Sequence, residues 1–163
     1  MSKLGVQHVL AVIALASMHL TQAQDLGCSS AVSLDGGTIE VEADASGNDT
    51  ENIQCALDAA IDGGYRDVFL TSPDYSIGAI AVTGFIGDLR GRSKANTTVT
   101  IQDSSLSCDE SIGVALEFRV GTASVRNMTL SVDSPCSDGS SASVIAYYSN
   151  PAQCSKRTTF GNV

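Results

Sequence analysis

A basic cluster in the middle of the chain is the best candidate for binding chemistry. Arg90, Arg92 and Lys94 lie close together in the sequence, and Arg119 and Arg126 would join them if successive turns of the chain stacked in register. Guanidinium and ammonium groups bind carboxylates through charge-assisted hydrogen bonds, so this cluster suits a ligand that carries carboxylates. The alternative is a set of solvated turn residues that balances the acidic half of the chain.

Carboxylates are plentiful, but their distribution does not favour a catalytic pair. Residues 25–88 hold 12 acidic residues and one basic residue, whereas residues 89–163 hold 6 acidic and 7 basic residues. Glycoside hydrolysis needs two carboxylates held on either side of the scissile bond. An acidic segment near the N-terminus is more typical of a solvated surface, so the catalytic residues, if the protein has any, remain unknown.

A second acidic feature concerns metal binding. Asp44, Asn48, Asp49 and Glu51 offer oxygen atoms to calcium, but their spacing lacks the glycine and the terminal glutamate of a calcium-binding loop. Helix capping by Asp49 or Thr50 explains these residues better. We therefore expect no metal site and no cofactor.

The first 23 residues have the pattern of a secretory signal peptide. Lys3 provides a basic start, residues 9–16 an apolar stretch, and residues 21–23 a small-residue cleavage site. The apolar stretch is shorter than the roughly 20 residues that a membrane span needs. The sequence predicts that residues 1–23 are removed and that the protein is secreted to the extracellular space, without a membrane span.

Removal of this leader would also restrict the available chemistry. The only histidines, His8 and His19, lie within it, so the remaining chain could form no Ser-His-Asp or Cys-His centre. The whole chain has a formal net charge of −9, which argues against a nucleic-acid partner, because that affinity depends on neutralising phosphates with Lys and Arg. The oligomeric state is not predictable from these features.

Five cysteines and three glycosylation sequons agree with export. An oxidising compartment favours disulfides, and the candidates are Cys28, Cys55, Cys108 and Cys136, with Cys154 left over. Cys55 falls on the polar face of a predicted helix, and Cys28 is its nearest candidate partner in the sequence. The sequon acceptors are Asn48, Asn96 and Asn127; Asn127 could instead stack in an internal asparagine ladder.

The elements that would position these residues are one helix and many short strands. Apolar residues at helical spacing predict a helix over residues 50–62, which Gly63 and Gly64 end. Strands are expected at residues 38–42, 67–70, 76–82, 85–89, 98–102, 114–120, 124–132 and 143–148. Periodicity leaves two architectures open, an antiparallel sandwich and a parallel solenoid; the interval from Ile101 to Met128 is close to one turn of the solenoid.

The order of motifs resembles the N-terminal region of the pectin lyase-like superfamily. Residues 43–60 (ADASGNDTENIQCALDAA) are similar to its loop and capping helix, and residues 68–77 (VFLTSPDYSI) to its strand-turn-strand element, with Asp74 where glycine is common. Residues 85–99 (FIGDLRGRSKANTTV) and 125–130 (VRNMTL) resemble two of its recurring coils, the first with Ser93 in place of a glycine.

This resemblance implies an all-β fold, a short right-handed parallel β-helix (solenoid) with an N-terminal capping α-helix. The expected organisation is a signal peptide (1–23), a partial β-helix domain (24–149) with its capping helix (50–62), and a polar tail (150–163). The implied function is binding or processing of extracellular, acidic polysaccharide, by a lyase-like or glycoside hydrolase-like activity if the protein is an enzyme, although no catalytic motif of the superfamily is found. The alternative is a non-catalytic extracellular structural or adhesion protein.

Overall fold

The computed structural model describes residues 26–47, 49–102, 114–133, 143–148 and 158–159. Several sequence-based predictions therefore lie outside the described residues: the signal peptide (1–23), the sequon acceptor Asn48, the cysteines at 108, 136 and 154, and most of the polar tail (150–163).

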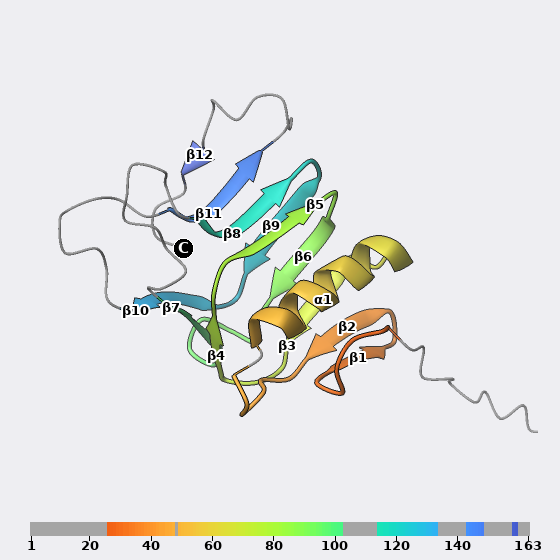
Figure 1. Ribbon diagram of the computed structural model, residues 1–163, viewed down its shortest axis with the longest axis horizontal. Coiled ribbons are helices and arrows are strands. Elements are labelled where there is room, and N and C mark those ends of the chain that lie inside the picture. Colours follow the sequence, from red (N-terminus) through yellow and green to blue (C-terminus); the bar gives the residue numbers. More distant parts are fainter. Residues whose placement is uncertain (1–25, 48, 103–113, 134–142, 149–157, 160–163) are drawn as a thin grey trace, which may run out of the picture.

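The described residues form one helix and twelve strands (Figure 1). The helix is α1 (Asp49–Gly63). The strands are β1 (Val32–Asp35), β2 (Thr38–Val41), β3 (Asp67–Leu70), β4 (Asp74–Ile77), β5 (Ile80–Thr83), β6 (Ile86–Arg90), β7 (Thr98–Gln102), β8 (Val114–Arg119), β9 (Thr122–Arg126), β10 (Thr129–Asp133), β11 (Ser143–Tyr148) and β12 (Thr158–Thr159).

From β3 to β11, strands that follow one another in the chain are distributed in turn over three sheets. The sheet orders are β1-β2-β3-β6-β9, β10-β7-β4 and β12-β11-β8-β5. Every pairing among these strands is parallel except β1 with β2 and β11 with β12. The chain is thus mainly β, with parallel sheets and one helix, and the antiparallel sandwich that the sequence left open is excluded.

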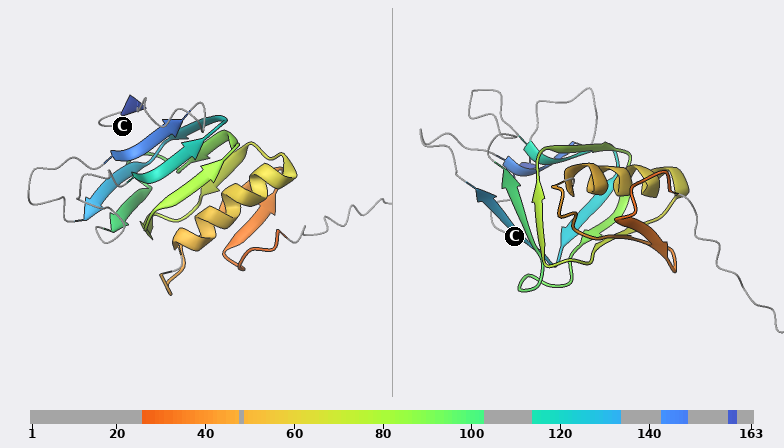
Figure 2. Two further views of the ribbon diagram at one scale, coloured as in Figure 1. Left: turned by 45° about the horizontal axis from the view of Figure 1, so that its top comes forward. Right: turned by 60° about the horizontal axis from the view of Figure 1, so that its bottom comes forward.

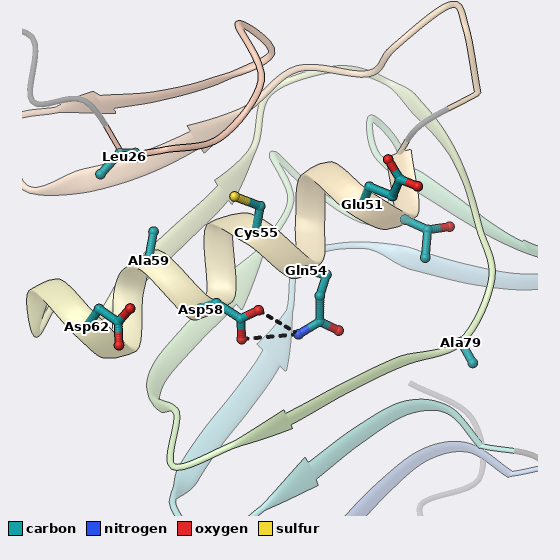
Figure 3. A pocket seen from close by; sticks show the side chains of 9 residues that line it. Leu26, Glu51, Gln54, Cys55, Asp58, Ala59, Asp62 and Ala79 are labelled. Atoms are coloured by element: carbon teal, nitrogen blue, oxygen red, sulfur yellow. Dashed lines mark hydrogen bonds between the residues drawn. The ribbon is translucent and has the colours of Figure 1, made fainter.

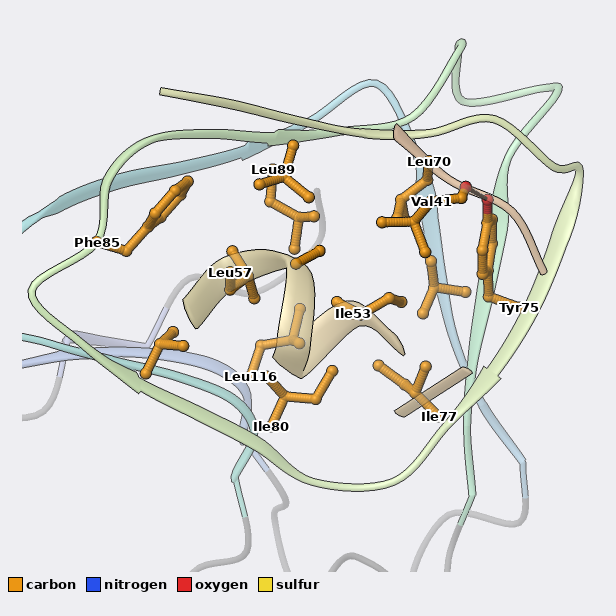
Figure 4. Close-up of a cluster of buried hydrophobic side chains, with 14 of the residues drawn as sticks. Val41, Ile53, Leu57, Leu70, Tyr75, Ile77, Ile80, Phe85, Leu89 and Leu116 are labelled. Carbon is orange, nitrogen blue, oxygen red and sulfur yellow. Dashed lines mark hydrogen bonds between the residues drawn. The ribbon is translucent and has the colours of Figure 1, made fainter. Parts of the chain in front are cut away.

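The register of the sheets lines up the apolar side chains that point inward. In the first sheet Ile39 pairs with Val68 and Val68 with Leu89, and all three are almost completely buried. Because the strand period is two residues, this register fixes which side chains of the same strands face outward. Figure 4 shows the inward residues of the sheets gathered around Ile53 and Leu57 of α1.

Helix α1 lies along the side of the sheets formed by the earliest strands (Figures 1 and 2). Its residues Ile53, Ala56, Leu57 and Ala60 are buried at helical spacing, as the amphipathic pattern predicted. It runs one residue further at each end than the predicted range 50–62. Gly64, with a φ of 70°, follows it in the left-handed conformation that ends many helices.

A disulfide joins Cys55 of α1 to Cys28, which confirms this predicted pair. It holds the segment before β1 against the outer face of the helix. A buried hydrogen-bond set fastens the neighbouring turn: the Tyr75 hydroxyl donates to the carbonyl oxygen of Val41 (2.6 Å) and accepts from the Ser72 N–H (2.8 Å). Burial raises the pKa of this Tyr75 hydroxyl.

Two expected strands are each divided by a corner. The predicted strand 76–82 is the end of β4 and most of β5, separated at Gly78 and Ala79, and the predicted strand 124–132 is divided between β9 and β10 at Asn127 and Met128. Asn127 has a φ of 58°, and this left-handed residue turns the chain from one sheet to the next. Ile101 pairs with Val132, so the interval from Ile101 to Met128 is shorter than the true spacing between these paired strands.

The disulfide gives a first prediction. Replacing both cysteines (Cys28→Ser with Cys55→Ser) should lower the free energy of unfolding by about 3 kcal/mol, because the crosslink restricts the unfolded chain. Urea unfolding in the absence of reducing agent, so that the disulfide of the wild type stays intact, measures this loss. Ser33→Ala, an exposed substitution on the nearby strand β1, should change little; an equally stable double variant would contradict the proposed importance of the crosslink.

Candidate functional site

The outward face of the first sheet carries charged residues in two adjacent rows. Asp67 of β3 pairs with Asp88 of β6, and the next outward position of these strands pairs Phe69 with Arg90. On the edge strand β9, Arg126 is the register partner of Arg90. The sheet therefore places two carboxylates and two guanidinium groups side by side on one surface.

Arg90 is held by three contacts. Its Nε and Nη2 atoms donate to the two carboxylate oxygens of Asp67, both at 2.7 Å, and its guanidinium carbon lies 4.1 Å from the ring centroid of Phe69. A two-point ion pair and a cation–π contact fix the guanidinium plane. The main role of Arg90 is therefore structural: its side chain links β6 to β3.

The same contacts set the charge state of Asp67. The hydrogen bond from Arg90 is the largest cause that lowers the pKa of Asp67; burial opposes it, and a hydrogen bond from the Thr38 hydroxyl (3.0 Å) adds to it. In return, the hydrogen bond to Asp67 raises the pKa of Arg90. Asp67 is an anion at neutral pH, so it holds no proton to donate to a substrate.

Arg126 is more accessible than Arg90. Its Nη2 atom lies 2.6 Å from Oδ2 of Asp88, yet its side chain is 51% exposed, compared with 26% for Arg90. A one-point ion pair at the surface contributes little to stability. Arg126 can therefore exchange its partner for another carboxylate more easily than Arg90 can.

The loop between β6 and β7 brings two further cations to this place. Arg92 and Lys94 are exposed, while the loop backbone is fastened: the Arg92 N–H donates to the hydroxyl of buried Thr97 (3.0 Å), and the Thr129 hydroxyl donates to the carbonyl oxygen of Lys94 (2.8 Å). We call Arg92, Lys94 and Arg126 the basic corner. No ion pair between described residues involves Arg92 or Lys94.

A glycine permits this close approach of loop and strand. The Gly91 N–H donates to the carbonyl oxygen of Arg126 (3.1 Å). A Cβ atom at Gly91 would lie 2.6 Å from the carbonyl oxygen of Asn127 and 2.6 Å from the Cβ atom of Thr97. Only glycine fits there without displacing the backbone that carries the basic corner.

Arg119, the remaining predicted binding residue, lies on another sheet. It ends β8, where it is the register partner of Thr83 and Tyr148, and it forms an ion pair with Glu117 at 2.9 Å. The structure therefore brings together Arg90, Arg92, Lys94 and Arg126 and leaves Arg119 apart.

The predicted sequon acceptors 96 and 127 also lie at the basic corner. Both asparagines are exposed. Gly91, which follows the adjacent strand β6, lies beside Asn127. Because this neighbour is not a second asparagine, the described residues provide no asparagine ladder at this position. Asn48 lies outside the described residues.

Asp49, one of the candidate calcium ligands, binds the backbone of two other segments. Asp49 is only 4% exposed; its Oδ1 accepts from the Asp44 N–H (2.7 Å) and its Oδ2 from the Ser76 N–H (2.8 Å). The Thr50 hydroxyl likewise accepts from the Gly78 N–H (2.8 Å). These side chains tie two loops to the start of α1. Within the described ranges, no group of three or more His, Cys, Asp or Glu side chains is arranged to hold a metal ion.

A second surface feature, which the sequence did not indicate, is a groove of about 480 Å3 over the outer face of α1 (Figure 3). Leu26 and Ala79 border it from segments on either side of the helix. The helix supplies Glu51, Asp58 and Asp62, and Gln54 donates to both Asp58 carboxylate oxygens at 3.2 Å. The groove is acidic, opposite in charge to the basic corner.

Comparisons of the chain with protein-family models, with curated proteins and with solved structures give no match. The single helix in the described part of the chain is neither long nor apolar enough to cross a membrane.

The ion pair of Asp67 predicts a dependence of stability on pH. Because the folded pKa of Asp67 is below its ordinary value of 3.8, its stabilising contribution is present at neutral pH and is lost as the pH falls from about 4 through the folded pKa. Asp67→Asn should lower the free energy of unfolding by about 1 kcal/mol at pH 7. The difference from the wild type should shrink at pH 2.5.

Urea unfolding of both proteins at the two pH values measures this effect. Asp62→Asn, at an exposed position of α1, is the control and should change stability little at either pH. A loss in Asp67→Asn that is equal at pH 7 and pH 2.5 would show that the ionised pair is not its cause.

Proposed function

We propose that this is a secreted protein with a short right-handed parallel β-helix, similar to the N-terminal region of pectin lyase-like proteins, which binds extracellular acidic polysaccharide at the basic corner. The assignment of consecutive strands to three parallel sheets in turn supports the β-helix. The disulfide between Cys28 and Cys55 is compatible with secretion.

The observation that carries the binding proposal is the register of Arg90 and Arg126 on adjacent strands. The loop after Arg90, which carries the exposed cations Arg92 and Lys94, is therefore held against the backbone around Arg126. Adjacent strands are about 4.8 Å apart, so the corner presents several cations within reach of successive carboxylates on one polymer. A single carboxylate would use only part of this surface.

The charges of the other surfaces described above favour binding at this corner. The formal net charge of the chain is −9, and the groove over α1 is lined by three acidic residues. An acidic polymer would be repelled by those surfaces and attracted to the corner over roughly one Debye length, about 8 Å at physiological salt. We therefore expect binding that weakens steeply with added salt.

The same geometry favours binding over catalysis at this surface. A general acid has to carry a proton at the working pH, but the ion pair with Arg90 keeps Asp67 ionised. Asp88 is likewise paired, with Arg126. Both carboxylates of the surface therefore serve to position arginines.

Substitutions at the basic corner test the proposal. Arg92→Ala with Lys94→Ala, and separately Arg126→Ala, should each weaken binding to polygalacturonate about tenfold, since they remove two cations and one cation respectively and a loss of about 1.4 kcal/mol is a tenfold change. Affinity electrophoresis in gels with and without polygalacturonate, at two salt concentrations, measures the effect.

Arg119→Ala is the matched control for Arg126→Ala. Both arginines are about half exposed and both are paired with one carboxylate, but Arg119 lies on a different sheet. Equal losses in the two variants would place binding elsewhere. An absence of binding by the wild type to a panel of acidic and neutral glycans would overturn the proposal and favour a structural or adhesion protein.

A further inference from the structure

The basic corner is bordered by two sites of the sequence N-x-T. Asn127 directly follows Arg126, and its sequon is completed by Thr129, the residue whose hydroxyl donates to the carbonyl oxygen of Lys94. Asn96 lies in the same loop as Arg92 and Lys94, and its sequon is completed by Thr98. The fold has thus brought together two acceptors that are 31 positions apart in the sequence, at the place where exposed cations gather in the described part of the chain.

The local conformation leaves both asparagine side chains open to modification. Asn127 occupies a corner with a φ of 58° and is exposed. Asn96 is exposed in a loop that is fastened by its backbone, where the Asn96 N–H donates to the carbonyl oxygen of Ser93 (3.1 Å). No hydrogen bond between described residues uses either side-chain amide, so modification would break no contact of the fold.

We propose that Asn96 and Asn127 carry N-linked glycans in the secreted protein, and that these glycans limit the access of acidic polysaccharide to the basic corner. The second part of this inference rests on the proposed function. In the reaction, the side-chain amide nitrogen forms a bond to the anomeric carbon of an oligosaccharide carried on a lipid pyrophosphate. The glycosyl–phosphate bond breaks, the lipid pyrophosphate leaves, and the amide loses one proton.

The expected effect is steric. An N-linked glycan is bulky and remains solvated at the surface, and each acceptor lies within two positions of a cation of the basic corner. A neutral glycan leaves the charges of Arg126 and Lys94 unchanged, but it occupies the space through which a polymer would approach. The glycosylated protein should keep its salt dependence of binding and lose affinity.

Occupancy is tested by the intact mass of the full chain secreted from eukaryotic cells. Asn96→Gln and Asn127→Gln should each remove the mass of one glycan. Thr98→Ser and Thr129→Ser are the matched controls, because both keep a functional sequon and a hydroxyl group. Wild-type protein without glycan at either position would overturn the proposal.

Access is tested on the folded, secreted wild type, so that no variant has to fold anew. Trimming the glycans with an endoglycosidase that leaves one sugar on each asparagine should tighten binding to polygalacturonate about five- to tenfold, a change of about 1 kcal/mol. An enzyme that hydrolyses the asparagine amide is unsuitable, because it would leave an aspartate and add negative charge beside Arg126. The double variant Asn96→Gln with Asn127→Gln should bind like the trimmed protein.

The outcomes separate this inference from the proposed function. Glycans present at both positions with unchanged affinity after trimming would overturn the access control and leave polysaccharide binding intact. Binding that is absent from the trimmed protein and from the double variant would overturn both the proposed function and the access control.

Discussion

The three sheets enclose an apolar interior, and the fold depends on covering this interior on the side where the earliest strands lie. Parallel strands that follow one another from sheet to sheet cannot bury their inward side chains unless a neighbouring turn or a cap covers them. Helix α1 provides this cover with Ile53 and Leu57, which are almost completely buried. Its position is fixed from outside by the Cys28–Cys55 disulfide and from its N-terminal end by the two carboxylate oxygens of Asp49. The register of the first sheet, and with it the basic corner, follows from this closed core.

The helix and the position of most strands could be predicted because their signals are local. The helical spacing of apolar residues ends at two glycines, and β3, β7 and β11 have the predicted bounds. The corners at Gly78 and Asn127 could not be found in this way, since each takes only about two residues and the apolar pattern continues on both sides of it. Strand β1 was missed for a related reason: it is a short edge strand, antiparallel to β2, with one buried residue, Val32.

The site was less predictable because it depends on which strands are neighbours. The sequence showed Arg90, Arg92 and Lys94 as a cluster, but only the register of β6 and β9 adds Arg126 to it. The interval from Ile101 to Met128 does not give the pairing of these strands, since the loops between strands differ in length and the partner of Ile101 is Val132. Arg119 lies outside the cluster because β8 belongs to a different sheet from β6 and β9. The pairing of Arg90 with Asp67 joins two strands and has no signal in either segment alone.

The division of work among the arginines follows from their place in the first sheet. Arg90 belongs to an inner strand, and the adjacent strand β3 supplies the carboxylate and the aromatic ring that its guanidinium contacts. Its side chain therefore stabilises the fold. Arg126 belongs to β9, the outermost strand of this sheet among the described residues, and half of its side chain faces solvent. Of these two register partners, Arg90 therefore stabilises the interior of the sheet, whereas Arg126 is accessible at its edge. Because the acidic groove lies over α1, beside the earliest strands, the described surfaces are electrically asymmetric, and the anionic polymer that we propose as the ligand would be directed toward β9 and the loop beside it.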